Sequence, residues 1–257
     1  MNVVCLGAGN VATHLAIALK AMGADIVQVW SHDFKNAEIL AALTKARAFH
    51  NWKNLDRNAD CYIIAVKDDA IPAIAAQLLD VKGIVVHTSG ATPITSLVGT
   101  GSGYGVLYPL QTFSKSKAVN LTLVPFCIEA DRPETLEKID AIAHLLSTSV
   151  AEVDSEQRKV LHVAAVVAAN FTNHLYHLSA QLLEQHQLKF DLLKPLIMET
   201  AEKVQSALPV NVQTGPAVRN DQVTMQRHLE LLDGSANLQQ IYQSLSESIL
   251  KTYHKKD

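Results

Sequence analysis

Short apolar runs and amphipathic stretches alternate through the first 153 residues. The apolar runs predict buried strands at residues 3–6, 26–30, 61–66 and 84–87. Helical segments of about 10 residues separate them, a pattern typical of βαβ units with right-handed crossovers. Two further strands, 125–130 and 149–153, flank a helix predicted at residues 133–146. The pattern therefore predicts an α/β fold with a doubly wound, mostly parallel sheet of the Rossmann type.

After residue 153 the strand-like runs disappear and helical periodicity continues to the C-terminus. Helices are predicted at residues 155–187, 192–208, 223–232 and 238–253. The first would be roughly 50 Å long at about 1.5 Å per residue, long enough to bridge two domains or two subunits. We therefore expect two domains, a dinucleotide-binding domain at 1–153 and an all-α domain for substrate binding and dimerisation at 154–257.

The dinucleotide interpretation comes from the turn after the first strand, GAGNVA at residues 7–12, which fits the pattern G-x-G-x-x-G/A. Gly7 permits the tight turn, Gly9 lets the backbone approach phosphate oxygens, and Ala12 lets helix and strand pack closely. Backbone N–H groups and the helix dipole then face the pyrophosphate. An ordinary glycine turn is the alternative, but the strand–turn–helix order favours a dinucleotide site.

The end of the second predicted strand bears on the choice between NADP and NAD. An acidic residue there binds the ribose 2′-hydroxyl of NAD, whereas hydroxyl and basic groups admit the 2′-phosphate of NADP. Ser31, His32 and Lys35 favour NADP, and Asp33 favours NAD. We expect NADP, with NAD as the alternative. A further alternative is that residues 31–33 form a solvated loop that binds no nucleotide.

Polar residues also follow the strands that end near residues 66 and 87. Ligands bind at the carboxyl ends of parallel strands, so these residues are expected in the cofactor crevice, although helix capping would explain them equally well. The predicted cofactor contacts are Gly7, Ala8, Gly9, Asn10, Val11, Ala12, Ser31, His32, Lys35, Val66, Lys67, Thr88 and Ser89.

The long predicted helix offers candidate catalytic residues. His162, Asn170 and Asn173 lie at α-helical spacing on one face. A histidine has the pKa range of a general acid, so His162 is predicted to protonate a developing alkoxide or amine, with Asn170 orienting the carbonyl or imine. Asn173 is a candidate substrate contact. The alternative is that this face meets a dimer partner or solvent.

Two further segments are candidates for substrate contact. Arg219 stands in a loop between helices, beside a rigid Gly-Pro turn, where its guanidinium could hold an anionic substrate. The alternative is a structural pair between Arg219 and Asp221, which could also cap the next helix. Gln111 and Thr112 follow an apolar segment expected to run under the nicotinamide, and they are predicted to line the site.

The composition narrows the function classes. The 257 residues carry a net charge of −3, which gives nucleic-acid binding no electrostatic support. The three cysteines lie in apolar runs, which indicates reduced core residues, and no pair of them has metal-ligand spacing, while the histidines are scattered apart from one helical group. With neither a signal peptide nor a membrane-spanning run in the pattern, we expect a cytoplasmic protein without metal, nucleic-acid or membrane partners.

Four segments together carry a family resemblance: GAGNVA at 7–12, AVKDD at 65–69, YPLQTF at 108–113 and TGPAVRND at 214–221. They resemble the Rossmann-like proteins with a helical C-terminal domain of unknown function, often labelled NADP oxidoreductases, over nearly the whole chain. More distantly the layout is similar to pyrroline-5-carboxylate reductase and to the 6-phosphogluconate and β-hydroxyacid dehydrogenases. The resemblance implies NADP and a homodimer formed through the helical domain, but no particular substrate.

One departure from these relatives leaves two functions open. The β-hydroxyacid dehydrogenases carry an active-site lysine on their long interdomain helix, and residues 160–174 contain none. The first hypothesis is an NADP-dependent oxidoreductase that moves a hydride between nicotinamide and a small oxo, hydroxy or imine substrate. The second is a non-catalytic NADP-binding sensor or interaction module, which the missing lysine favours.

Overall fold

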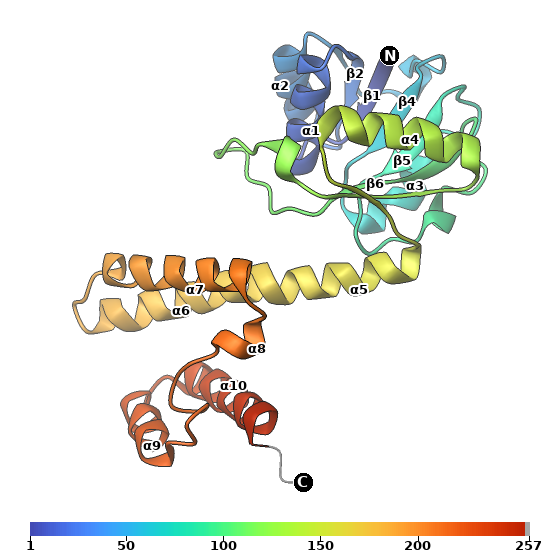
Figure 1. Ribbon diagram of the computed structural model, residues 1–257. Coiled ribbons are helices and arrows are strands. Elements are labelled where there is room, and N and C mark those ends of the chain that lie inside the picture. The colour runs from blue at the N-terminus through green and yellow to red at the C-terminus, as the bar shows by residue number, and fades with distance from the viewer. Residues whose placement is uncertain (255–257) are drawn as a thin grey trace. The chain divides into compact units, whose positions relative to one another are not determined.

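Residues 1–254 are described by a computed structural model and form two compact units, Met1–Asn170 and Phe171–Asp257 (Figure 1). The predicted domain boundary after residue 153 falls at the end of the last strand. Residues 154–170 belong to the first unit by their contacts. A buried ion pair attaches their helix to the sheet. No helix in residues 1–254 has the length and apolar character needed to cross a membrane.

The first unit is built on one sheet with the strand order β3-β2-β1-β4-β5-β6-β7-β8. The strands are β1 (Asn2–Leu6), β2 (Asp25–Trp30), β3 (Arg47–Phe49), β4 (Cys61–Ile64), β5 (Ile84–His87), β6 (Tyr104–Pro109), β7 (Phe126–Ala130) and β8 (Val150–Glu152). Every neighbouring pair is parallel except β6 and β7. The predicted mostly parallel α/β fold is confirmed. Strands β3 and β6 were not among the predicted strands.

Helices cover both faces of this sheet. The helices α1 (Asn10–Ala21), α2 (Phe34–Thr44) and α4 (Pro133–Leu146) pack on one face, and α3 (Ile71–Ala75) packs on the other with short 3-10 turns (Figure 1). Strand residues point alternately to the two faces, so that Val3 contributes to one core and Val4 to the other. Both faces are apolar because both are covered, as parallel sheets require.

The cysteines are buried and form no disulfides. Cys5 and Cys61 lie in the core beneath α1, and burial raises the pKa of Cys5 to about 12 and that of Cys61 further still. Because the thiolate is the reactive form, these two side chains are inert packing residues at neutral pH.

The helix α5 (Ser155–Ala165) is fastened to the sheet through its first turn. Asp154 and Gln157 form a capping box at its start. The guanidinium of Arg158, which is 0% exposed, pairs with the Glu129 carboxylate on β7 and donates to the Thr92 carbonyl oxygen at 2.6 Å. A buried charge is tolerated when a partner of opposite sign and further hydrogen bonds compensate its desolvation. This arrangement fixes where the next turn of α5 lies.

A π-helical segment, Val166–Phe171, follows α5 directly and leads into α6 (Thr172–Gln185). The sequence predicted one regular helix over this stretch. Periodicity alone does not reveal a π segment, which comes from one residue too many within a turn.

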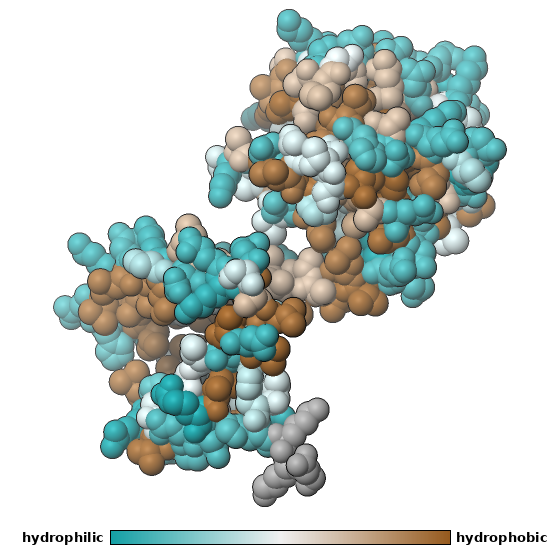
Figure 2. Space-filling model, viewed as in Figure 1, coloured by the Kyte–Doolittle hydropathy of each residue, from teal (hydrophilic) through white to brown (hydrophobic). Residues whose placement is uncertain are grey.

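The second unit is helical throughout its described part, as predicted. After α6 it contains α7 (Lys194–Ser206), α8 (Pro209–Val212), α9 (Gln222–Leu231) and α10 (Ala236–Tyr253). In its described part, the buried apolar residues are only Leu178, Ala217, Met225 and Leu232. Many large apolar side chains lie on its surface instead, some of which Figure 2 shows in brown. Such a surface is unusual for an isolated globular unit.

Candidate functional site

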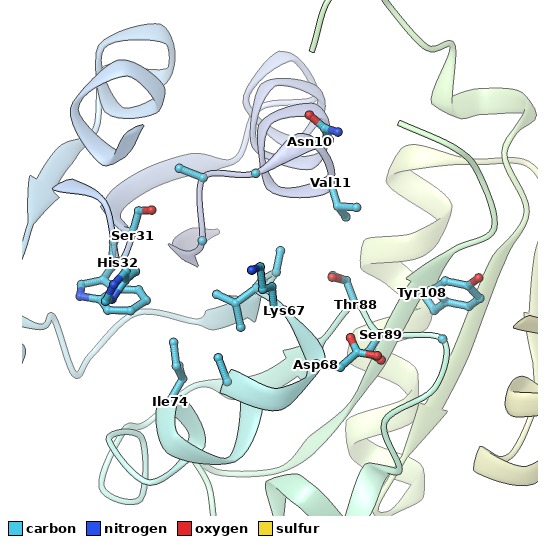
Figure 3. A pocket seen from close by; sticks show the side chains of 18 of the residues that line it. Asn10, Val11, Ser31, His32, Lys67, Asp68, Ile74, Thr88, Ser89 and Tyr108 are labelled. Carbon is cyan, nitrogen blue, oxygen red and sulfur yellow. The ribbon is translucent and has the colours of Figure 1, made fainter. Parts of the chain in front are cut away.

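A cavity of about 1020 Å³ opens at the carboxyl ends of the parallel strands, within the first unit. It lies where the strand order reverses, between β1 and β4, the position at which open α/β sheets bind ligands. Its walls come from the turn after β1, the ends of β2, β4, β5 and β6, the helix α3, Trp52 and one residue of α5 (Figure 3). The predicted residues that line it are Gly7, Ala8, Gly9, Asn10, Val11, Ser31, His32, Val66, Lys67, Thr88, Ser89, Gln111 and His162.

The glycine turn has the geometry that an anion site needs. Gly7 has φ +124°, and a Cβ there would collide with the carbonyl oxygen of Ala65. Gly9 is the N-cap of α1 and no side chain caps the helix, while a Cβ added at Gly9 meets nothing within 4 Å. The start of α1 therefore presents backbone N–H groups to open space. Ala12 is buried beneath the turn rather than in the cavity wall, where it lets α1 approach the sheet.

The end of β2 forms another wall. Ser31 and His32 line the cavity there, and the ring of Trp30 lies 4.8 Å, centre to centre, from that of Trp52. The Asp33 carboxylate accepts hydrogen bonds from the backbone N–H of Lys35 at 3.0 Å and from the Asn36 side chain at 2.9 Å. Asp33 is thus occupied as the N-cap of α2, and neither it nor Lys35 lines the cavity.

The turn after β5 combines a structural role with a place in the wall. The hydroxyl of Ser89 accepts hydrogen bonds from the backbone N–H groups of Ala91 and Thr92, so this serine does stabilise its own turn. His87, just before it, is 0% exposed. Burial, and then the nearby Arg158 charge, lower the pKa of His87 to about 3, so the ring is neutral near pH 7. His87 therefore serves as a core residue.

At the other end of the cavity, two side chains meet that are far apart in the sequence. The Tyr108 hydroxyl on β6 and Nδ1 of His162 on α5 share a hydrogen bond of 3.0 Å. A Cβ at Gly90 would lie 2.6 Å from this Nδ1 and 2.8 Å from Cζ of Tyr108, so only glycine leaves room for both rings. Burial raises the pKa of Tyr108, which keeps its hydroxyl protonated.

Several lining residues were not predicted from the sequence. They are Trp30, Trp52, Ala65, Asp68, Ala70, Ala73, Ile74, Gln77, Gly90, Tyr108 and Pro109. Tyr108 begins the YPLQTF segment at 108–113, but the sequence pattern contains no sign that its hydroxyl reaches α5. That contact depends on β6 lying next to β5, a property of the sheet order. Trp30 and Trp52 could not be predicted either, because a tryptophan that lines a cavity looks like a core residue in the sequence.

The remaining predicted site residues lie outside this cavity. Thr112 is exposed, and its backbone N–H donates to the Gln111 side chain. Asn170 lies exposed in the π segment, while Asn173 on α6 and Arg219 in the loop before α9 are exposed in the second unit. The shared face of His162, Asn170 and Asn173 was inferred from regular α-helical spacing, which the π segment interrupts. Their roles stay predictions.

The loop at 214–221 has a clear structural role for one residue. Asp221 accepts hydrogen bonds from the backbone N–H and the hydroxyl of Thr224, as the N-cap of α9, and these bonds lower its pKa. Arg219 forms no ion pair with any described residue, so its guanidinium is not used in a structural pair with Asp221.

Two family models match the chain. Residues 1–87 match the oxidoreductase family with an NAD-binding Rossmann fold, and residues 124–249 match a domain of unknown function, DUF2520. With the cavity and its glycine turn, the first match defines the class of protein, one with an NAD(P)-binding Rossmann fold. A search of curated proteins returned no significant match.

Solved structures narrow the class to a family. A Bacteroides fragilis protein named "putative NADP oxidoreductase" is 42% identical, with a TM-score of 0.92 over 97% of this chain and 98% of that one. The chain therefore belongs to the family of that protein, in which a Rossmann NAD(P)-binding domain precedes the domain of unknown function.

More distant structures share the fold alone. A pyrroline-5-carboxylate reductase from Coxiella burnetii is 16% identical, with a TM-score of 0.58 over 98% of this chain and 97% of that one. A reductive aminase from Aspergillus terreus, in complex with NADPH and ethyl-5-oxohexanoate, is 13% identical, with a TM-score of 0.69 over 98% and 94%. The predicted resemblance to the oxidoreductase family is confirmed by the Bacteroides fragilis protein, and the resemblance to pyrroline-5-carboxylate reductase is confirmed for the fold.

The two glycines of the turn predict opposite outcomes for the same substitution. In Gly9→Ala the added methyl group meets no protein atom within 4 Å, so the free energy of unfolding should fall by no more than about 1 kcal/mol, the usual cost of alanine at an N-cap. Affinity for the dinucleotide should fall at least about tenfold, because the methyl group keeps phosphate oxygens away from the backbone N–H groups. Isothermal titration with NADPH and NADH, together with urea unfolding, measures both quantities.

Gly7→Ala is the matched variant. Its Cβ collides with the Ala65 carbonyl, and its φ is unfavourable for alanine, so unfolding should become easier by more than about 1 kcal/mol. Full dinucleotide affinity in Gly9→Ala would show that the cofactor does not use this turn.

Proposed function

We propose that the protein is an NADP-dependent oxidoreductase acting on a small oxo, hydroxy or imine compound. The observation that supports it is one cavity with an anion-binding glycine turn at one end and a histidine hydrogen-bonded to a tyrosine at the other. The bound dinucleotide would supply or accept the hydride. His162 would give its proton to the alkoxide or amine nitrogen that forms as the hydride arrives, and would take it back in the reverse direction.

The role of Asp33 as a helix cap supports the choice of NADP over NAD. An acidic residue at the end of β2 favours NAD when its carboxylate is free to bind the ribose hydroxyls. Here the carboxylate caps α2, whereas the hydroxyl of Ser31 and the ring of His32 line the cavity. The name of the Bacteroides fragilis relative and the NADPH in the Aspergillus terreus structure support the same choice.

For the substrate we propose an oxo compound or the imine derived from one. The reductive aminase of similar fold holds a keto ester beside NADPH, which supports this class. Gln111 lines the cavity, and we propose Asn170, Asn173, Thr112 and Arg219 as further substrate contacts.

We further propose that the protein is a homodimer that assembles through the helical unit. That unit lacks a sizeable apolar core of its own in its described part, and a second copy would cover its surface. The large apolar residues exposed there are Phe171, Leu188, Leu192, Leu196, Met198, Val204, Leu208, Val210, Val223, Leu231 and Leu245. The resemblance to dehydrogenases with dimeric helical domains supports this proposal.

The cofactor proposal predicts the effect of a charge at Ser31. Ser31→Asp places a carboxylate where the 2′-phosphate is expected, so the dissociation constant for NADPH should rise at least about tenfold while that for NADH falls or stays the same. Fluorescence titration with both nucleotides measures the ratio. Ser102→Asp, an exposed serine outside this cavity, adds the same charge as a control. An unchanged ratio in Ser31→Asp would place the 2′-phosphate elsewhere.

Turnover and the role of His162 are tested together. A panel of keto acids, cyclic imines, amine–ketone mixtures and deazaflavins is followed by the absorbance of NADPH at ~340 nm, the nicotinamide band of the cofactor. His162→Gln should lower kcat about 100-fold or more and leave NADPH affinity unchanged. His144→Gln, on the surface of α4, is the control. Tight NADPH binding without turnover of any compound would favour the sensor function, for which the absence of lysine from 160–174 is the supporting observation.

The dimer proposal predicts the effect of one buried charge. Leu196 on α7 is 63% exposed in the single chain, and Leu196→Lys would bury an unpaired charge in the proposed interface. Sedimentation equilibrium should show a dimer for the wild type and a monomer, or a much weaker dimer, for the variant. Glu202→Lys, exposed on the same helix, should remain dimeric. A monomeric wild type would rule the proposal out.

A further inference from the structure

Both ring nitrogens of His162 matter for proton transfer, and the structure distinguishes them. Nδ1 shares its hydrogen bond with Tyr108 at 3.0 Å, and the two rings meet edge to face at 72°. Nε2 has no hydrogen-bond partner among the described residues, and it is not among their buried unpartnered polar atoms. Of the two nitrogens, Nε2 is therefore the one free to meet a ligand in the cavity that His162 lines.

Two neighbours, Arg158 and Gly90, hold this pair in place, together with the limited freedom of Tyr108 itself. Arg158 lies one helical turn before His162, and its ion pair with Glu129 fastens that face of α5 to the sheet. Gly90 leaves the space into which both rings fit. Tyr108 itself is 9% exposed and comes from the strand β6, so its ring has little freedom to move. Burial raises its pKa, so the hydroxyl stays neutral. Tyr108 is consequently a hydrogen-bond partner rather than an acid at ordinary pH.

We propose that Tyr108 is a positioning residue that makes Nε2 the proton-transferring atom of His162. This inference rests on the proposed function. In the charged ring, Nδ1–H donates to the Tyr108 oxygen, and Nε2–H faces the substrate. When the hydride reaches the substrate carbon, the Nε2 proton passes to the alkoxide or amine nitrogen. The ring is then neutral and keeps its remaining proton on Nδ1, still donated to Tyr108. Nε2 regains a proton from solvent, or accepts one from an alcohol or amine in the reverse reaction.

A double-mutant cycle separates this role from a general structural one. Tyr108→Phe keeps the ring and removes only the hydroxyl, so NADPH affinity and the free energy of unfolding should stay close to wild type. We expect kcat to fall about 10- to 100-fold, within the range of general acid–base effects. In a His162→Gln background the same substitution should cause no further loss, because Tyr108 acts only through His162.

Tyr104→Phe is the matched control, since Tyr104 lies on the same strand, outside the cavity. It should leave kcat unchanged. Equal, independent losses from Tyr108→Phe in both backgrounds would overturn the proposal, and so would an unchanged kcat in Tyr108→Phe.

A second measurement needs no turnover and therefore distinguishes failure of this inference from failure of the proposed function. Nitrogen-15 NMR of labelled histidine reports which ring nitrogen carries the proton, and His162→Gln assigns the signals. When its ring is neutral, His162 should carry the proton on Nδ1 in the wild type and in Tyr104→Phe. In Tyr108→Phe its signals should move to the average of two exchanging tautomers. A proton on Nε2 in the wild type, or identical spectra in Tyr108→Phe, would overturn the positioning role even if the enzyme turns over.

Discussion

The first unit depends on the close approach of the turn after β1 to the strands on either side. The Gly7 N–H donates to the carbonyl oxygen of Trp30 on β2 at 2.7 Å, and the carbonyl of Ala65 beyond β4 leaves no space for a Cβ at Gly7. This packing lets the ends of β1, β2 and β4 converge, and it points the start of α1 at the gap between them. A larger residue would separate the strand ends, and the cavity would lose the wall that gives it an affinity for anions.

A second constraint, the ion pair between Arg158 and Glu129, places His162 in the wall of that cavity. Without the buried pair of Arg158 and Glu129, α5 would have no charged anchor on the sheet, and His162 would not be held against Tyr108. A buried ion pair adds little net stability, because desolvation offsets most of the attraction. Its value here is geometric: two rings from distant segments meet at one hydrogen bond. Burial is the main reason that His87 is neutral, and the nearby positive charge of Arg158 lowers the pKa of its ring further.

The parts of this structure that local patterns control could be predicted from the sequence. Buried strands, the glycine turn and α4, whose predicted bounds agree with the observed ones, all depend on neighbouring residues, so periodicity and capping reveal them. Strand β3 has only three residues, too few to show a period. The placement of Ser31 and His32 in the cavity wall followed from fold logic. The role of Asp33 did not, because a capping carboxylate and a ribose-binding one look alike in a sequence.

Tyr108 and the π segment show a different limit. The hydrogen bond between Tyr108 and His162 joins residues 54 apart, and it exists only because the sheet order and the Arg158 anchor bring β6 and α5 together. The π segment rotates every later residue relative to α-helical spacing, so a face drawn through His162 and Asn173 cannot be taken from the sequence. Long-range contacts and helix irregularities are set by tertiary packing, which single-sequence patterns do not contain.

The arrangement around His162 bears on whether the coenzyme is consumed or only bound. A sensor needs contacts to the dinucleotide, and the glycine turn with the strand ends would supply them. It has no use for an imidazole whose Nδ1 is engaged and whose Nε2 has no partner among the described residues, or for a glycine at residue 90 that makes room for it. Unpartnered polar atoms at the edge of a cavity are typical of sites that handle a reacting group. The missing lysine is therefore compatible with the proposed oxidoreductase, in which His162 on α5 takes the place of that proton donor.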